Sequence, residues 1–245
     1  MDCYLKFAHI YDKLINCDIN YTEWAKFINK LLDKYDIKRD DYLDLACGTG
    51  NMTEIIKEGF NNTYAVDKSS EMLSEAEEKM RASSKKVMFI SQDMSKLNLN
   101  HKFDLITCCL DSINYLTQDK MISACFKSVY EHLNYGGIFV FDINSYYKLS
   151  EILGNNTFTY DDDDVFYVWE NSFENGILDM YLTFFIKNND IYSRFDEEHS
   201  ERAYKEEIIE KYLGEAGFAL LNKFDNYTFN ETNEKTERIL YVVKK

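Results

Sequence analysis

The sequence has no proline among its 245 residues and only nine glycines. Glycine and asparagine must therefore mark the breaks between helices and strands. No apolar run approaches the ~20 residues that a helix needs to span a bilayer. The first residues, MDCYLKFAHIYDK, lack the basic stretch followed by an apolar stretch that a secretory signal requires. These absences predict a cytoplasmic protein without a membrane-spanning helix.

Cysteine pairs of the C-x-x-C type are also missing, although the chain has six cysteines. Several of them lie in apolar, strand-like runs, which is typical of buried thiols. We therefore expect neither a disulfide framework nor a metal site. The six are Cys3, Cys17, Cys47, Cys108, Cys109 and Cys125.

Positive charge is scarce, because the formal net charge is -15. A surface of this sign repels the phosphate backbone of nucleic acids. The basic clusters, such as Lys85-Lys86 and Lys244-Lys245, are short. The charge therefore predicts no nucleic-acid partner and favours a small-molecule substrate, with a monomer or homodimer as the expected assembly.

From residue 41 the chain alternates short apolar runs, typical of strands, with amphipathic stretches, typical of helices. Strands separated by helices at this interval form parallel βαβ units. The sequence therefore predicts an α/β fold with a Rossmann-like, doubly wound and mostly parallel sheet, preceded by a helical cap over residues 1–40. The first five strands are expected at 42–46, 63–66, 87–91, 103–110 and 138–143.

The alternation stops between residues 146 and 204, where the sequence is aromatic and strand-like. Three strand candidates, 165–170, 177–187 and 191–195, follow one another without helices, which predicts an inserted small antiparallel sheet on the substrate side. A helix at 205–216 and strands at 218–224 and 238–243 then complete the core. The expected core is thus 41–145 together with 205–245.

The segment LDLACGTGN at Leu43–Asn51 carries the strongest functional signal. Gly48 and Gly50 follow the first strand directly, so the backbone can turn tightly and a ligand can approach it closely. A dinucleotide-binding loop has a third glycine where this chain has Thr53. Asp44 is placed to accept a hydrogen bond from an ammonium group, such as the α-amino group of S-adenosylmethionine. The alternative is that Asp44 fixes the loop by accepting backbone N–H groups.

Two further acids follow the next two strands. Asp67 lies about 20 residues beyond the glycine loop, where a carboxylate can hold two ribose hydroxyls. Asp93 is expected to accept from the exocyclic amine of adenine, with Met94 against the ring. The alternative for Asp93 is a polar loop residue without a ligand.

Five segments together resemble the successive signature segments of class I S-adenosylmethionine-dependent methyltransferases, in order and spacing. The resemblance covers roughly residues 40–145 and implies S-adenosylmethionine as the cofactor and a seven-stranded sheet whose last strand is antiparallel. The outer segments FAHIYDKL and HSERAYKEEIIEKYLGEAGF are similar to small-molecule N-methyltransferases, including those that dimethylate nucleotide-linked amino sugars. The five segments are LDLACGTGN, AVDKSSEML, ISQDMSKL, FDLITCCLDSINYL and LNYGGIFVFDIN.

The resemblance also implies roles for individual residues. Tyr11, the tyrosine of the FAxxYD segment, is expected over the cofactor and the substrate. Lys68 stands where relatives have an apolar residue against adenine, and its alkyl stem can do the same. No basic residue lies in 16–21 to anchor the methionine carboxylate. The remaining expected cofactor contacts are Trp24, Ala46, Met72 and Leu110.

Methyl transfer from a sulfonium needs alignment more than acid–base chemistry, because the leaving group is already activated. Tyr11, Asp111 and His199 are the candidate catalytic residues. Asp111, with Ser112, follows the fourth strand, where it either orients or deprotonates the substrate or simply caps the next turn. His199 either faces the cavity or has a structural role.

The aromatic richness of residues 146–185 allows two interpretations: a cage for a cationic amine, or the core of a small sheet. Two rival functions also remain. A nicotinamide-dependent dehydrogenase is disfavoured by Thr53 and Asp44. A non-catalytic adenosylmethionine-binding regulator or scaffold is compatible with the same motifs. The leading hypothesis is a methyltransferase acting on a small molecule, at an amine nitrogen.

Overall fold

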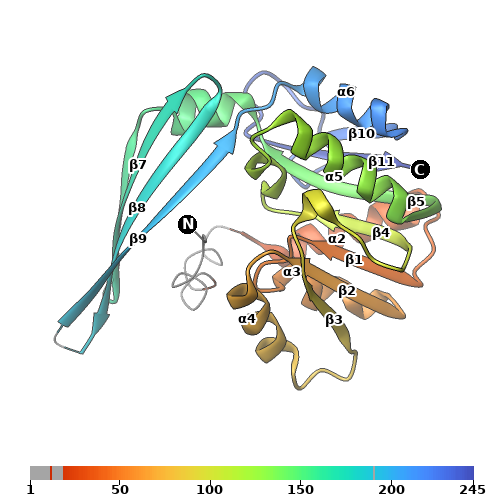
Figure 1. Cartoon of the computed structure of the whole chain (residues 1–245), viewed down its shortest axis with the longest axis horizontal. Helices are drawn as coiled ribbons and strands as arrows, with labels where there is room; N and C mark the ends of the chain where they lie inside the picture. The colour runs from red at the N-terminus through yellow and green to blue at the C-terminus, as the bar shows by residue number, and fades with distance from the viewer. Residues whose placement is uncertain (1–11, 13–18, 190) are drawn as a thin grey trace.

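The computed structural model describes residue 12 and residues 19–245 except 190 (Figure 1). Its larger sheet has seven strands in the order β10-β11-β5-β4-β1-β2-β3. β11 pairs antiparallel with both β5 and β10, whereas the other pairs are parallel. This confirms the predicted Rossmann-like sheet and its antiparallel last strand. The strands are β1 (Asp41–Leu45), β2 (Asn62–Asp67), β3 (Val87–Ser91), β4 (Phe103–Cys108), β5 (Leu133–Asn144), β10 (Ala219–Asp225) and β11 (Arg238–Lys244).

Five α-helices flank this sheet in the described part of the chain. Asparagine and serine begin two of them as expected for N-caps: Asn20 accepts from the Glu23 N–H, and Ser69 from the Met72 N–H. None of the described helices combines the length and the apolar character needed to cross a bilayer. The helices are α2 (Tyr21–Lys34), α3 (Asn51–Ile56), α4 (Ser70–Met80), α5 (Asp119–His132) and α6 (Glu206–Ala216), with short helical turns η1 (Lys57–Gly59), η2 (Met94–Lys96), η3 (Ser112–Tyr115) and η4 (Lys148–Leu153).

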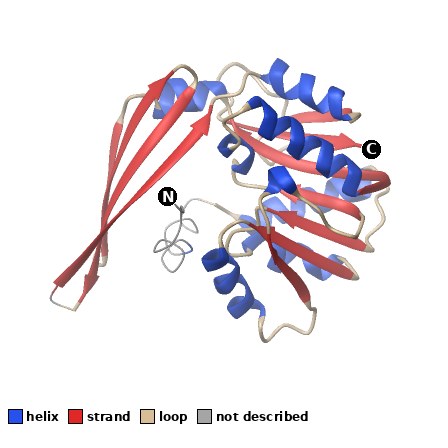
Figure 2. Cartoon of the chain, in the orientation of Figure 1, coloured by secondary structure: helices blue, strands red, loops and turns tan. Residues whose placement is uncertain are grey.

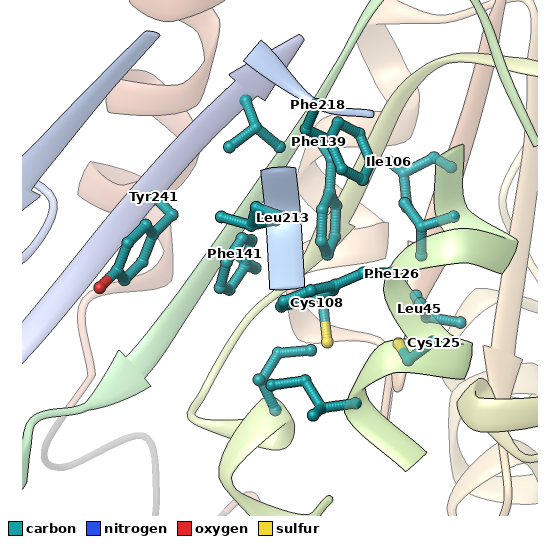
Figure 3. Close-up of a cluster of buried hydrophobic side chains, with 14 of the residues drawn as sticks. Leu45, Ile106, Cys108, Cys125, Phe126, Phe139, Phe141, Leu213, Phe218 and Tyr241 are labelled. Carbon is teal, nitrogen blue, oxygen red and sulfur yellow. The ribbon is translucent and has the colours of Figure 1, made fainter. Parts of the chain in front are cut away.

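The two faces of the sheet are buried under different helices, because side chains alternate along each strand. Leu43 and Leu45 of β1 face the cluster formed with α5 and α6, which Figure 3 shows around Phe126, Phe139 and Leu213. Tyr42 faces the opposite cluster, formed with α2 and α3. The core is therefore a helix–sheet–helix sandwich that holds the carboxyl ends of the parallel strands in fixed places.

A second sheet, β6–β9, projects from the core as a long twisted ribbon (Figures 1 and 2). We call it the insert sheet. It has four antiparallel strands where the sequence predicted three, because the short edge strand β6 has no apolar run to reveal it. β9 also extends to Arg202 instead of ending at residue 195, since pairing with β8 outweighs the polar sequence EEHSER. The strands are β6 (Thr157–Asp161), β7 (Val165–Glu174), β8 (Ile177–Asn188) and β9 (Ile191–Arg202).

The start of β5 also differs from the sequence prediction. Residues 134–137, which precede the strand expected at 138–143, lie within β5, which begins at Leu133 directly after α5. Gly136 still has a φ of 83°, and the register against β4 shifts between Phe103 and Leu105. Glycine therefore does mark a turn here, but the turn lies inside an irregular strand.

Gly50, at the start of α3, provides a test of close packing. Its φ is 77°, and an added Cβ would lie 2.5 Å from Met80 Cε and 3.1 Å from Ala76 Cβ. Gly176 has nearly the same φ, 78°, but open space around it. Gly50→Ala should therefore lower the free energy of unfolding by about 1–2 kcal/mol more than Gly176→Ala, because only the first overpacks the α3–α4 contact. Urea denaturation of both variants measures the difference, and equal losses would contradict it.

Candidate active site

A cavity of about 740 Å³ opens between the carboxyl ends of the core strands and one face of the insert sheet. It lies where the strand order reverses between β1 and β4, which is the usual ligand site of an open α/β sheet. Most residues that the sequence singled out line it. They are Asp44, Ala46, Gly48, Asp67, Lys68, Met72, Asp93, Met94, Leu110, Asp111 and His199.

Two of the predicted residues that the structure describes, Trp24 and Gly50, do not line the cavity. Trp24 is buried beneath it and stacks on Tyr227, with ring centroids 3.8 Å apart, while Tyr21 of the same helix reaches the cavity. Gly50 packs against α4. Tyr11 lies outside the described residues, so its predicted role stays a prediction.

The glycine loop turns through left-handed conformations at Ala46, Gly48 and Gly50, with φ values of 56°, 54° and 77°. Two contacts with β2 hold it: the Cys47 N–H donates to the Val66 carbonyl at 3.0 Å, and the Gly48 N–H donates to Asp67 at 2.8 Å. Apart from Gly48 and its two chain neighbours, no heavy atom of the described residues lies within 4 Å of the position of a Cβ on Gly48. The missing side chain therefore leaves the backbone open to a ligand at this point.

Asp67 has a second function that its position in the sequence did not reveal. One carboxylate oxygen accepts from the Gly48 N–H and the other from the Ser69 N–H, both at 2.8 Å. Burial nevertheless raises the pKa of this carboxyl, against the effect of those bonds. Asp67 thus joins the glycine loop to the start of α4 while it faces the cavity, and a sugar diol would complete its coordination.

Asp44 is held by hydroxyl groups instead of the backbone N–H groups considered as the alternative. Thr53 donates to one oxygen at 2.5 Å and Thr107 to the other at 2.9 Å. Burial raises its pKa to about 6, although the two hydroxyls oppose this. Thr53 therefore supports Asp44 at the position where a dinucleotide-binding loop needs glycine. The ammonium contact of Asp44 stays a prediction.

Asp93 begins η2, and one of its oxygens accepts from both the N–H and the hydroxyl of Ser95, at 2.8 and 2.7 Å. Burial opposes ionisation, but the bonds from Ser95 leave its pKa below the ordinary value. No described residue donates a hydrogen bond to the second oxygen, and Asp93 lines the cavity together with Met94. This arrangement fits an acceptor for an adenine amine.

The sequence analysis missed Asp12, which contacts the glycine loop. Its carboxylate lies 2.6 Å from Lys79 and accepts from the Thr49 hydroxyl and the Asn51 amide at 2.6 and 2.9 Å. Although burial opposes it, these bonds hold the pKa of Asp12 below its ordinary value. The aspartate of the FAxxYD segment was therefore as informative as the tyrosine beside it.

The turn after β4 contains two consecutive non-glycine residues in the left-handed region, Leu110 at φ 59° and Asp111 at φ 50°. Asp142 of β5 holds both, because its two oxygens accept from their N–H groups at 2.9 and 2.7 Å. Tyr227 and Arg238 also donate to Asp142. A buried carboxylate thus fixes a strained turn at the cavity wall.

Asp111 does not cap the following turn with its side chain, so that alternative is wrong. Its carboxylate instead pairs with Arg238 at 2.8 Å. Ser112 donates to the Cys109 carbonyl at 3.0 Å and so stabilises the same turn. Asp111 therefore lies at the cavity with its charge partly neutralised, and its catalytic role stays a prediction.

The insert sheet contributes one face to the cavity. Tyr167, Trp169 and Phe184 line it, and the buried Trp169 indole N–H has no hydrogen-bond partner among the described residues. Phe184 also stacks on Phe195, so the same aromatics serve as cavity wall and as sheet packing. The interpretation as sheet packing is confirmed for Phe184, whereas the cage for a cationic amine stays a prediction.

Two titratable residues of β9 point into the cavity from this face. Burial lowers the pKa of His199 to about 4, so its imidazole is neutral at pH 7. Glu201, two residues on, is only 3% exposed and accepts from the Asn144 amide at 3.0 Å. The sequence analysis missed Glu201, although the alternation of a strand that places His199 in the cavity places Glu201 there too.

Comparison with known proteins identifies the family. A family model described as a methyltransferase domain matches residues 43–137. YqeM of Bacillus subtilis strain 168, whose name assigns it provisionally to the methyltransferases, is 34% identical over 246 residues, 99% of this chain and 97% of YqeM. An S-adenosylmethionine-dependent methyltransferase from Clostridium acetobutylicum ATCC 824 is 56% identical over 99% of both chains, with a TM-score of 0.93. A Streptomyces venezuelae protein, dTDP-3-amino-3,4,6-trideoxy-alpha-D-glucopyranose N,N-dimethyltransferase, is 28% identical over 121 residues, 49% of each chain.

The fold and the cavity at its strand ends define a methyltransferase. The chain belongs to the S-adenosylmethionine-dependent methyltransferases, which confirms the resemblance, the enzyme class and the cofactor inferred from the sequence. The residues at the cavity fit this cofactor, because Gly48 leaves room for close approach and Asp67 and Asp93 present acceptors along the same wall.

Proposed function

We propose that this methyltransferase methylates the amine nitrogen of a small molecule. The observation that carries the proposal is the single cavity that joins the cofactor loop to the aromatic face of the insert sheet. Its volume of about 740 Å³ falls within the range of small-molecule sites and is large enough for a donor and a compact acceptor together.

The chemical character of the insert side supports an amine. Aromatic faces attract cationic groups, and Tyr167 and Trp169 lie on the same cavity as the carboxyl groups of Asp111 and Glu201. The relative from Streptomyces venezuelae, named as an amino-sugar N,N-dimethyltransferase, is consistent with this choice.

The protein's contribution is mainly alignment. When bound, S-adenosylmethionine supplies a methyl group on a positively charged sulfur, which is already a good leaving group. Asp67 would hold its ribose hydroxyls, Asp93 its adenine amine and Asp44 its ammonium group. The turn held by Asp142 fixes Leu110 and Asp111 beside the acceptor. Alignment of two reactants can supply about 7–11 kcal/mol of the barrier reduction.

A methyl-acceptor screen with radiolabelled S-adenosylmethionine tests the proposal. Acceptors are supplied as matched sets in which one scaffold, such as a nucleotide-linked sugar, carries an amine, a hydroxyl or a carboxylate at the same position. We expect label only in amine members, with methylated nitrogen confirmed by mass spectrometry. Label in the hydroxyl or carboxylate members instead would contradict the choice of nitrogen.

A further inference from the structure

The cavity contains a buried carboxyl group that the core does not neutralise. Glu201 comes from β9, and its carboxylate accepts a hydrogen bond from the Asn144 amide at 3.0 Å. Among the described residues no cationic nitrogen lies within 4.0 Å of its carboxylate. Buried carboxylates normally have a cationic partner, because an isolated charge is costly to remove from water.

The neighbouring charges explain why Glu201 lacks a partner. Arg238 is already shared by two carboxylates, Asp111 at 2.8 Å and the fully buried Asp142. Lys148 donates to Asn144 at 3.0 Å, on the other atom of the amide that contacts Glu201. The Arg238 guanidinium is therefore paired with two carboxylates. The third acid, Glu201, faces the cavity and accepts a hydrogen bond from one uncharged donor, the Asn144 amide.

We propose that Glu201 is the anionic subsite that receives the protonated acceptor amine and takes its proton. The inference rests on the proposed amine function, which it deepens by naming the protonation state of the substrate and the group that changes it. The aromatic side chains of Tyr167 and Trp169 border the same space and suit the organic part of such a cation.

The proton step balances within the site. An N–H bond of the ammonium breaks and an O–H bond forms on the Glu201 carboxylate. The electron pair of the broken bond stays on nitrogen, which becomes a neutral nucleophile that can form the new bond to the methyl carbon. Glu201 keeps this proton when the product leaves and releases it to solvent when the next ammonium group binds, so each turnover releases one proton.

The groups around Glu201 shift its pKa in the direction that a proton acceptor needs. Burial raises its pKa to about 8 and the charge of Asp111 adds to this, whereas Asn144, Lys148 and Arg238 oppose it. A base whose pKa lies near the working pH transfers protons efficiently in both directions. His199, on the same strand, has its pKa lowered to about 4 by burial, so it is a much weaker base than Glu201.

Calorimetry with simple probes tests the subsite without turnover. The protein is saturated with S-adenosylhomocysteine and titrated at pH 7 with benzylamine, benzyltrimethylammonium or benzyl alcohol, in two buffers of different ionisation enthalpy. Both cations should bind at least tenfold more tightly than the alcohol. Each should release close to one proton, because a carboxyl with a pKa of about 8 must ionise to pair with a cation. The alcohol should release none.

Variants show which residue releases the proton that calorimetry detects. Glu201→Gln should abolish both the release and the preference for cations, whereas Glu198→Gln, at the exposed neighbouring position on the opposite face of β9, should change neither. In the native protein the release should decline towards zero at pH 9, a measurement that needs no variant. Equal binding of benzylamine and benzyl alcohol, no release in the native protein, or release that persists in Glu201→Gln would overturn the inference.

The two proposals fail separately. Methylation of amines without proton release that depends on Glu201 would leave the proposed function intact and remove this subsite. Proton release that depends on Glu201, together with methylation of hydroxyl groups alone, would keep the cation subsite and remove the proposed nitrogen acceptor.

Discussion

Replacing Asp67 by alanine should raise the Kd for S-adenosylhomocysteine about 100-fold. The carboxylate makes two hydrogen bonds of 2.8 Å that join the glycine loop to α4, and the proposed contact with the ribose hydroxyls would be lost as well. Hydrogen bonds to a charged group contribute roughly 1.5–3 kcal/mol. Titration calorimetry measures the change, with circular dichroism to show that the variant folds.

Glu54→Ala is the matched control for this experiment. Glu54 is exposed on α3, the helix that follows the glycine loop, and its side chain makes no hydrogen bond or ion pair with the described residues. We expect its Kd to change less than threefold. A loss below tenfold for Asp67→Ala would show that Asp67 neither fixes the loop nor binds the cofactor as described.

Replacing Arg238 by methionine should cost about 3 kcal/mol of unfolding free energy. The guanidinium pairs with Asp111 and with the fully buried Asp142, and removing one partner of a buried pair leaves an uncompensated charge. At about 2–4 °C per kcal/mol for a chain of this size, the Tm should fall by roughly 6–12 °C. Differential scanning calorimetry measures it.

The chain offers an exposed pair for comparison. Arg194 lies 2.9 Å from Asp196, with side chains 60% and 56% exposed. Arg194→Met should change stability by no more than about 0.5 kcal/mol, because solvent screens the pair. The double variant Arg238→Met/Asp142→Asn should lose less than the two single losses added together, since it removes both charges. Equal effects of the two arginine variants would contradict the assignment of Arg238 as the partner of Asp142.

Local periodicity was sufficient to predict the core but not the insert sheet in full. The amphipathic helices and apolar strands of the core each bury a continuous stripe, which a short window of sequence reveals. β6 and the second half of β9 carry polar residues that are extended only because a neighbouring strand pairs with them. Such pairing between distant residues leaves no local signal.

The residues of the candidate site could be predicted where they lie directly at the end of a strand. Asp44, Asp67, Asp93 and Asp111 were found in this way. The residues that hold Asp111 were not, because Asp142 and Arg238 contact it from 31 and 127 positions away in the chain. The position of the Trp24 side chain was missed for a related reason. The sequence placed this aromatic residue near the cavity, but its ring stacks on Tyr227 and lies in the core.

The donor side and the acceptor side of the cavity are encoded by different parts of the gene. The three carboxyl groups proposed to hold the methyl donor, Asp44, Asp67 and Asp93, lie between residues 44 and 93, whereas the aromatic wall and Glu201 lie between 167 and 201. A recombination or a run of mutations within the insert would thus change the shape and the proton chemistry of the acceptor site together. The donor site would stay unchanged. Related enzymes can therefore acquire new acceptors while they bind the donor in the same way.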